Sequence, residues 1–250
     1  MRSGVHRQYP YCPLPLFAVI LHGSKGINDP GVTLVLTNWK RPENVRLIID
    51  QLLGQTLKPT LFLWNNLPPF LHPGVDWQVD SSVNKMCLPR WYMASFAQTE
   101  FVGVMDDDVI FTDTKVLEDA AIFLLSMPEE TAIGFTGMHF DPRKDYREGL
   151  HIVASKDADQ PADVIKGRFM LLRTAQLARF HLHPSPQREH LIGEDILMSG
   201  MLSQGKTGVH RVPALFAGRW QELPAPHGLF HLSDHWFHRE SARRAVFLRE

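Results

Sequence analysis

The 250-residue chain has little net charge, few cysteines and no long hydrophobic run. Its formal net charge at pH 7 is -1 and both signs are scattered, so no basic face marks it as a nucleic-acid-binding protein. Two cysteines, Cys12 and Cys87, form no disulfide framework and favour a reducing compartment. The apolar stretch at residues 14–21 is interrupted by Pro15 and is too short to span a bilayer. We therefore expect a cytoplasmic protein without a transmembrane segment, although a chain separated from its membrane anchor would look the same.

The chain does have enough hydrophobic material for one large α/β domain, since 44% of its residues are hydrophobic. Residues 1–30 are rich in Gly, Pro and His, which predicts an irregular leader with a short strand at residues 17–21. No internal repeat or low-complexity segment divides the rest. We expect residues 31–250 to form a single domain.

A strand, a helix and a second strand are expected in succession at the start of this domain. Residues 32–37 are apolar and β-branched, which is typical of a buried strand. A helix is expected from Pro42 until Gly54 ends it, and residues 60–64 form the next strand. This order predicts a mostly parallel, mixed central sheet flanked by helices.

The later elements are predicted from the same patterns. A buried strand is expected at residues 101–105. Helices are expected at residues 84–98, which contain Pro89, at 114–126, at 195–203 and from about 236 onward, and strands at 132–136, 164–172 and 209–212. Residues 141–161 are polar and charged, which is typical of a mobile loop.

Three carboxylates, Asp106, Asp107 and Asp108, directly follow the strand expected at residues 101–105. Adjacent carboxylates repel one another, and this position is costly unless a cation neutralises them. Mg²⁺ and Mn²⁺ prefer oxygen ligands and often bridge carboxylates to substrate phosphates. Ligands also bind at the carboxyl ends of strands in open α/β sheets. A solvated, helix-capping turn is the plainer interpretation, but the next helix is expected only near residue 114, so we predict a metal site.

A second acidic pair, Glu194 and Asp195, opens the helix expected at residues 195–203. The helix dipole favours negative charge there by about 0.3–1 kcal/mol, which explains the pair without any function. A carboxylate at the mouth of a pocket also accepts a proton from a hydroxyl or stabilises positive charge on a sugar ring. Composition favours neither interpretation over the other.

Residues 227–239 are dense in histidine and aromatic residues. They contain no tetrahedral zinc pattern, and we expect His227 and His231 to pack against the last helix. Imidazole is able to complete a Mn²⁺ shell, so His238 remains a candidate metal ligand. Arg239 is suited to a bidentate contact with a diphosphate.

The ordered set of these motifs resembles the GT-A class of nucleotide-sugar glycosyltransferases, and within it the exostosin-like transferases. The similar segments are TNWKRPENV at residues 37–45, LWNN at 63–66, NKM at 84–86 with Arg90, MDDD at 105–108, GEDI at 193–196 and WFHR at 236–239. The match runs from about residue 32 to 245, and the shared order and spacing carry it.

This resemblance implies a GT-A fold and a metal-dependent transfer of a sugar from a nucleotide-diphosphate sugar, with uridine the expected base, to a hydroxyl of a glycan or another acceptor. The implied cofactor is Mn²⁺ or Mg²⁺. Its implied ligands are Asp108, Asp106 and His238, and Asp106 also contacts the ribose. The implied nucleotide and diphosphate contacts are Arg41, Asn66, Asn84, Lys85, Arg90, Asp106, Asp107 and Arg239. The implied catalytic residues are Asp195 and Glu194.

The chain departs from the exostosin-like pattern in three places. Lys85 replaces an arginine, the spacing from Asn84 to Arg90 is one residue longer, and a Glu-Asp pair replaces Asp-Asp. Glu-Asp also occurs in inverting members of the class, in which the Asp is the base. Asp195 is therefore expected to deprotonate the acceptor in an inverting reaction, or to orient the acceptor or steady an oxocarbenium-like centre in a retaining one.

Two other functions remain open. A nucleotidyltransferase has a similar sheet and metal carboxylates, but it usually carries a Gly-rich loop with a basic residue after the first strand. Residues 38–42 contain no glycine. A non-catalytic binding protein is able to use the same fold, and the intact acidic segments argue against it.

Overall fold

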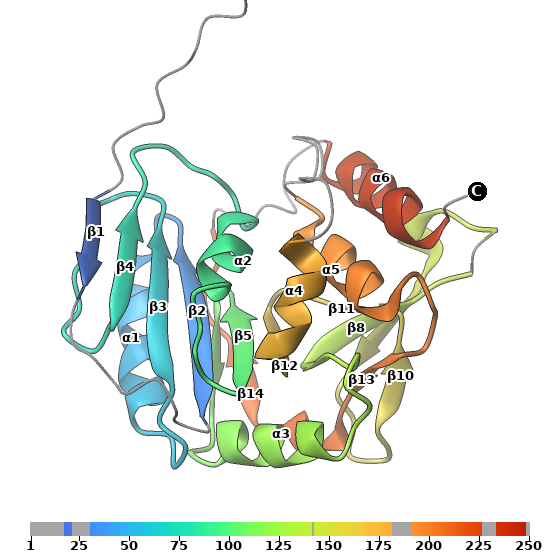
Figure 1. Ribbon diagram of the computed structural model, residues 1–250, viewed down its shortest axis with the longest axis horizontal. Helices are drawn as coiled ribbons and strands as arrows, with labels where there is room; N and C mark the ends of the chain where they lie inside the picture. The colour runs from blue at the N-terminus through green and yellow to red at the C-terminus, as the bar shows by residue number, and fades with distance from the viewer. Residues whose placement is uncertain (1–17, 22–30, 142, 182–191, 227–233, 249–250) are drawn as a thin grey trace, which may run out of the picture.

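The chain folds around a nine-stranded mixed sheet (Figure 1), and the computed structural model describes it at residues 18–21, 31–141, 143–181, 192–226 and 234–248. The strand order is β1-β4-β3-β2-β5-β12-β7-β13-β10. This arrangement confirms the predicted α/β class with a mixed sheet. Most of residues 1–30, including Cys12, lies outside the described residues, but β1 (Ala18–Leu21) occupies the place of the strand expected at 17–21.

The first strand, helix and strand of the domain form as predicted. β2 (Val32–Asn38) is buried along its whole length. α1 (Pro42–Leu53) begins at a proline, whose missing N–H is not needed in the first turn, and ends at Gly54. The helix buries one apolar face and leads into β3 (Thr60–Asn65), which pairs in parallel with β2.

Two further strands extend this parallel half of the sheet. β4 (Trp77–Asp80) pairs in parallel with β3, and β5 (Phe101–Met105) pairs in parallel with the other side of β2. Parallel strands end at the same edge of a sheet. The segments that follow β2, β3 and β5 therefore lie together at one edge.

The other half of the sheet is mixed. β12 (Phe169–Arg173) runs antiparallel to both β5 and β7 (Ile133–Gly134). β13 (His210–Val212) pairs in parallel with β7, and β10 (Gln160–Ala162) pairs antiparallel with β13. The strand predicted at residues 209–212 is confirmed as β13.

Two small sheets and several short helices complete the fold. One sheet has the order β11 (Val164–Ile165), β8 (Thr136–His139) and β9 (Leu150–Val153), and the other pairs β14 (Trp220–Glu222) with β6 (Val109–Phe111). The short helices are η1 (Tyr146–Glu148), η2 (Thr174–Gln176), α4 (Leu177–His181) and η4 (Ala214–Phe216).

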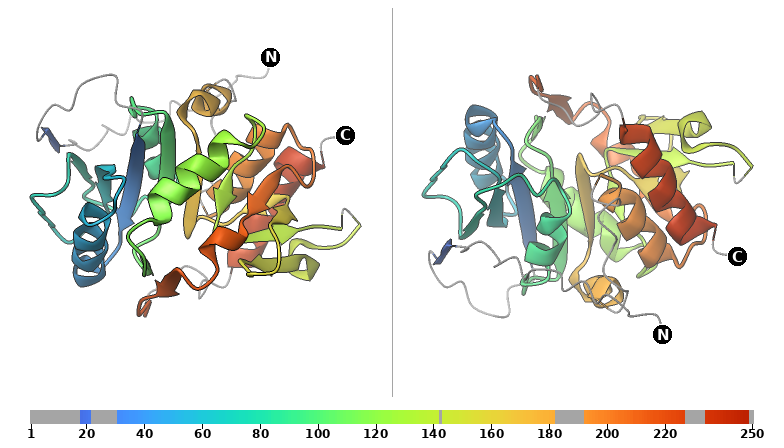
Figure 2. Two further views of the ribbon diagram at one scale, coloured as in Figure 1. Left: turned by 90° about the horizontal axis from the view of Figure 1, so that it is seen from below. Right: turned by 90° about the horizontal axis from the view of Figure 1, so that it is seen from above.

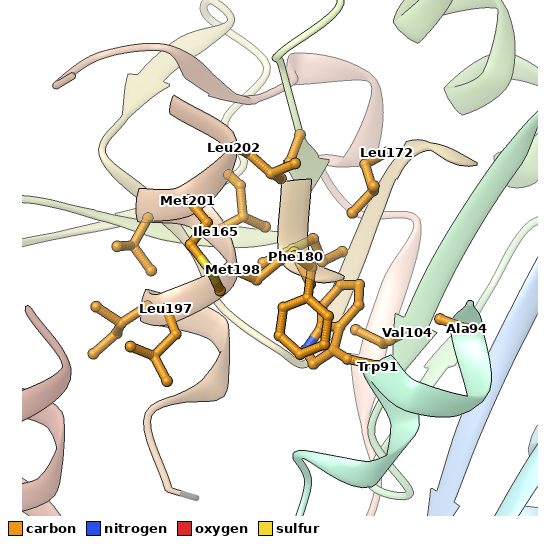
Figure 3. Packing of buried hydrophobic residues seen from close by; sticks show 14 of the residues in the cluster. Trp91, Ala94, Val104, Ile165, Leu172, Phe180, Leu197, Met198, Met201 and Leu202 are labelled. Carbon is orange, nitrogen blue, oxygen red and sulfur yellow. The ribbon is translucent and has the colours of Figure 1, made fainter. Parts of the chain in front are cut away.

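Helices cover both faces of the central sheet, as the views from below and above in Figure 2 show. Alternate residues of β2 point to opposite cores: Leu34 packs with α1 and α3 (Val116–Leu125), and Val35 packs on the side of α2 (Pro89–Ala94) and α5 (Glu194–Ser203). Trp91, Phe180 and Met198 lie in the second core (Figure 3). The last helix, α6 (His235–Phe247), packs on α5. In the described part of the chain, no helix has the length and hydropathy needed to cross a membrane.

Four sequence predictions need correction. The helix expected at residues 84–98 begins only at Pro89, because a proline nitrogen suits a first turn and not a helix interior. The strand expected at residues 164–172 is broken into β11 and β12 by a turn at residues 166–168 that contains a glycine. Of the strand expected at 132–136, only residues 133–134 form β7, and residue 136 begins β8 in another sheet. Residues 141–161 contain η1, β9 and the start of β10 instead of an irregular loop.

Candidate functional site

A cavity of about 520 Å³ lies at the edge where β2, β3 and β5 end. Its wall combines the turn between β2 and α1, the segment before α2, the acidic triplet after β5, the turn between β11 and β12, and the starts of α5 and α6. Ten of the residues predicted for the site line this cavity: Arg41, Asn66, Asn84, Arg90, Asp106, Asp107, Asp108, Glu194, Asp195 and Arg239. The fold thus brings together two acidic segments that lie almost ninety residues apart.

The middle carboxylate of the triplet, Asp107, is turned into the protein. Its Oδ2 accepts a hydrogen bond from the backbone N–H of Trp39 at 2.7 Å, and its Oδ1 forms an ion pair with the Arg41 guanidinium. Its backbone carbonyl accepts from Asn44 Nδ2 at 3.0 Å. Burial raises the pKa of Asp107 to about 6, although Arg41 opposes the shift. Asp107 therefore ties the triplet to the turn between β2 and α1.

The two outer carboxylates, Asp106 and Asp108, remain accessible from the cavity, with side-chain exposures of 28% and 23%. Burial, followed by the charges of Asp106 and Asp107, raises the pKa of Asp108 to about 7. A cation would relieve this crowding of negative charge.

The donor atoms at the triplet are carboxylate oxygens, which suit Mn²⁺ or Mg²⁺. Within the described residues, no group of three or more His, Cys, Asp or Glu side chains is arranged to hold a metal by itself. Hard divalent cations are often held by only one or two carboxylates, with substrate phosphates completing the shell. The residues present fit this second kind of site.

Arg90 links the triplet to the second acidic pair. Its side chain is only 1% exposed, and its Nη1 and Nη2 atoms lie 2.5 Å from Asp106 Oδ1 and 2.5 Å from Glu194 Oε1. Burial raises the pKa of Glu194 to about 7, with Arg90 opposing the shift. Gly167 makes room for the guanidinium, because a Cβ there would lie 2.1 Å from Arg90 Nη2. Both acidic segments are thus held by one buried cation.

Asp195 is held by a separate network. Its Oδ2 accepts from Arg239 Nη2 at 2.9 Å and from the Gly167 N–H at 3.3 Å. Arg239 also donates to the hydroxyl of Tyr146 at 2.7 Å and lies over its ring at 4.9 Å. Burial alone would raise the pKa of Asp195, but Arg239, together with Lys166 and Arg90, outweighs burial and the pKa is lowered. Asp195 therefore stays ionised near neutral pH.

The predicted nucleotide contacts Asn66 and Asn84 shape one wall of the cavity. Asn66 Oδ1 accepts from Trp64 Nε1 at 2.9 Å and from the backbone N–H of Lys85 at 2.9 Å. Asn84 Oδ1 accepts from the N–H of Met86 at 2.8 Å, and Met86 takes a left-handed conformation with φ 59°. The Lys85 side chain is not part of the cavity lining.

Only one of the two histidines at the start of α6 lines the cavity. His235 lines the cavity and is four residues before Arg239, so the two share a face. His238, predicted as a metal ligand, is not part of the lining, and its Nε2 lies 3.0 Å from Asp234. His227 and His231 lie outside the described residues. The histidine at the site is thus the one that helical periodicity pairs with Arg239.

Sequence reasoning did not select several other residues of the site. Tyr146 lies in the segment expected as a loop, and Lys166 and Arg168 lie in the turn that breaks the expected strand at 164–172. Lys166 contacts His151, and burial lowers the pKa of Lys166 to about 8. Gly167 lies between the two basic residues, and a glycine inside an expected strand is a signal that the strand is interrupted there.

Comparison with known proteins identifies the fold. No protein-family model and no curated protein matches the chain. The mannosyltransferase PcManGT from Pyrobaculum calidifontis, in complex with GDP-Man and Mn²⁺, superposes with a TM-score of 0.51 and 16% identity over 75% of this chain and 57% of that one. S. aureus TarS 1–349 superposes with a TM-score of 0.54 and 13% identity over 74% and 58%. Its complex with UDP-GlcNAc gives 0.53 and 12% over 74% and 56%.

These superpositions show that the chain has a glycosyltransferase fold. They also show that the chain spans less than two thirds of the length of those proteins. At such low identity the likeness is one of fold alone. The resemblance to exostosin-like transferases stays a prediction.

Proposed function

We propose that this protein is a metal-dependent glycosyltransferase that moves a sugar from a nucleoside-diphosphate sugar to an acceptor hydroxyl. The observation that carries the proposal is the pairing of two acidic segments in one cavity. Asp106 and Asp108 reach the cavity from the end of β5, and Asp195 reaches it from the start of α5. We also propose that residues 31–250 form the catalytic domain.

The donor side is built around the triplet. Asp106 and Asp108 would hold Mn²⁺ or Mg²⁺, which when bound supplies positive charge to the leaving diphosphate. Thr37 Oγ1 and Arg41 Nε are buried at the cavity wall and make no hydrogen bond within the described residues. Uridine is the expected base, and since the comparisons include a GDP-Man complex and a UDP-GlcNAc complex, a test has to include both bases.

The reaction breaks the bond between the sugar carbon and the diphosphate oxygen, and the electron pair leaves with the diphosphate. The acceptor oxygen forms the new bond, and its proton passes to the leaving diphosphate. Asp195 has a lowered pKa, and a weak base is a poor proton acceptor at neutral pH. We therefore assign Asp195 to stabilising positive charge on the sugar, with Arg239 and Tyr146 fixing the carboxylate.

The proposal is tested by titrating the protein with UDP, GDP and their sugars, with and without Mn²⁺. We expect at least one nucleotide to bind in a metal-dependent way and Asp108→Asn to abolish that dependence. Asp157→Asn is the matched control, because Asp157 is exposed and does not line the cavity. Equal metal dependence in Asp108→Asn and wild type would contradict the assignment. Pyrophosphate release from a nucleoside triphosphate and a sugar phosphate would identify a nucleotidyltransferase instead.

A further inference from the structure

Five basic side chains line the cavity, and they differ in how firmly they are held. The three buried ones are bound to carboxylates: Arg41 to Asp107, Arg90 to Asp106 and Glu194, and Arg239 to Asp195. Lys166 contacts His151. Arg168 pairs with Glu222, and this is the most exposed ion pair at the cavity, with exposures of 39% and 59%.

The fold places this exposed pair directly beside the acidic triplet. The backbone carbonyl of Arg168 accepts from the N–H of Asp106 at 3.0 Å. The residue after Glu222, Leu223, donates its N–H to the carbonyl of Asp108 at 2.7 Å. The backbones of Arg168 and of the residue after Glu222 are therefore anchored to Asp106 and Asp108, the residues proposed to hold the metal.

We propose that Arg168 binds the diphosphate of the donor and that Glu222 is its partner only while the donor is absent. This inference rests on the proposed function. An exposed ion pair contributes little net stability, so Arg168 leaves Glu222 at small cost. The planar guanidinium matches two phosphate oxygens at once, which gives a stronger contact than the one it replaces. Arg239 was the residue expected in this role from the sequence, but it is committed to Asp195 and Tyr146.

The inference predicts opposite effects for the two members of the pair. Arg168→Met should weaken binding of UDP, GDP and inorganic pyrophosphate in the presence of Mn²⁺ by about tenfold or more, because a charged hydrogen-bonded contact is lost. Glu222→Gln should bind at least as tightly as wild type, with a gain of up to about fivefold, because the competing carboxylate is gone. Arg168→Lys keeps the charge but cannot contact two phosphate oxygens in the planar, bidentate way, so its affinity should lie between those of wild type and Arg168→Met.

The measurement is isothermal titration of each variant with the three probes. Arg143→Met is the matched control, since Arg143 forms an exposed pair with Asp141 away from the cavity lining and should bind as wild type. If Arg168→Met fails to fold, the affinities of Arg168→Lys and Glu222→Gln for the three probes test the inference. Wild-type affinity in Arg168→Met or Arg168→Lys overturns this inference but leaves the proposed function standing. The same follows if Glu222→Gln weakens binding as much as Arg168→Met does, because the ion pair would then have a structural role. Failure of the wild type to bind any probe overturns both this inference and the proposed function.

Discussion

Gly167→Ala is predicted to break the buried contact between Arg90 and Glu194. A Cβ at position 167 would lie 2.1 Å from Arg90 Nη2 and 3.2 Å from Glu194 Oε1. Non-bonded heavy atoms need roughly 3.5 Å, so the guanidinium has to retreat by more than about 1 Å. Retreat of that size lengthens the 2.5 Å contact with Glu194 to the limit of hydrogen bonding or beyond it.

The expected loss of stability depends on pH because Glu194 is buried and titrates near neutral pH. Removing one partner of a buried ion pair costs about 3–5 kcal/mol. Burial raises the pKa of Glu194 to about 7, above its unfolded value, even with Arg90 opposing the shift. A group of this kind favours the folded state most when it is protonated, below its unfolded pKa, and that contribution is lost as pH rises through about 7. Glu194 limits this cost by taking up a proton, so the destabilisation by Gly167→Ala should be small at pH 5 and about 1.4 kcal/mol larger at pH 8, one pH unit above the pKa.

The assay is urea unfolding of wild type, Gly167→Ala, Arg90→Met and the double variant at pH 5 and pH 8. If the new methyl group acts only by displacing Arg90, Gly167→Ala adds less than about 0.5 kcal/mol in the Arg90→Met background. If the two substitutions lower the free energy of unfolding additively at pH 8, this reasoning is refuted, because the new methyl group would then clash with something other than Arg90. Wild-type stability of Gly167→Ala at pH 8 would refute the position of the guanidinium itself.

Three further outcomes are expected. Asp195→Asn should bind Mn²⁺ and nucleotide nearly as wild type while turnover falls at least about 100-fold, and equal loss of both would indicate a structural role for Asp195. Tyr146→Phe keeps the ring but loses the hydroxyl that accepts from Arg239, so we expect about 1 kcal/mol lower stability and a lower kcat with an unchanged nucleotide affinity, whereas weaker nucleotide binding would contradict this placement. Burial lowers the pKa of His210 to about 4, so its contribution to stability is complete above about pH 6.5 and is lost as pH falls through 4. Comparison of wild type with His210→Gln by urea unfolding should show a difference that shrinks by about 3 kcal/mol over that range, and a constant difference would argue against a buried neutral imidazole.

The sequence predicted the parts of the fold that rest on local patterns. The apolar strand at residues 101–105 and the acidic triplet after it form β5 and one wall of the cavity, as expected. The helix opened by Glu194 and Asp195 also forms where its apolar pattern placed it. These elements depend on hydrophobic runs, prolines and glycines that act over a few residues.

The rest depends on contacts between distant parts of the chain. Arg90 was predicted to bind the nucleotide, but its two carboxylate partners, Asp106 and Glu194, lie 16 and 104 residues away. No local pattern reports such a pairing. The left-handed conformation of Met86 likewise has no local signal in the sequence. The choice between His235 and His238 was within reach of the sequence, because only His235 lies one helical turn from Arg239.

The most direct test of glycosyl transfer is the release of nucleoside diphosphate from a panel of nucleotide sugars in the presence of Mn²⁺. We expect wild type to hydrolyse or transfer at least one donor, with the activity lost on chelation of the metal and in Asp108→Asn and Asp195→Asn, and retained in Asp157→Asn. Release at equal rates by wild type and Asp108→Asn, or no release from any donor with any acceptor sugar tested, would contradict the account.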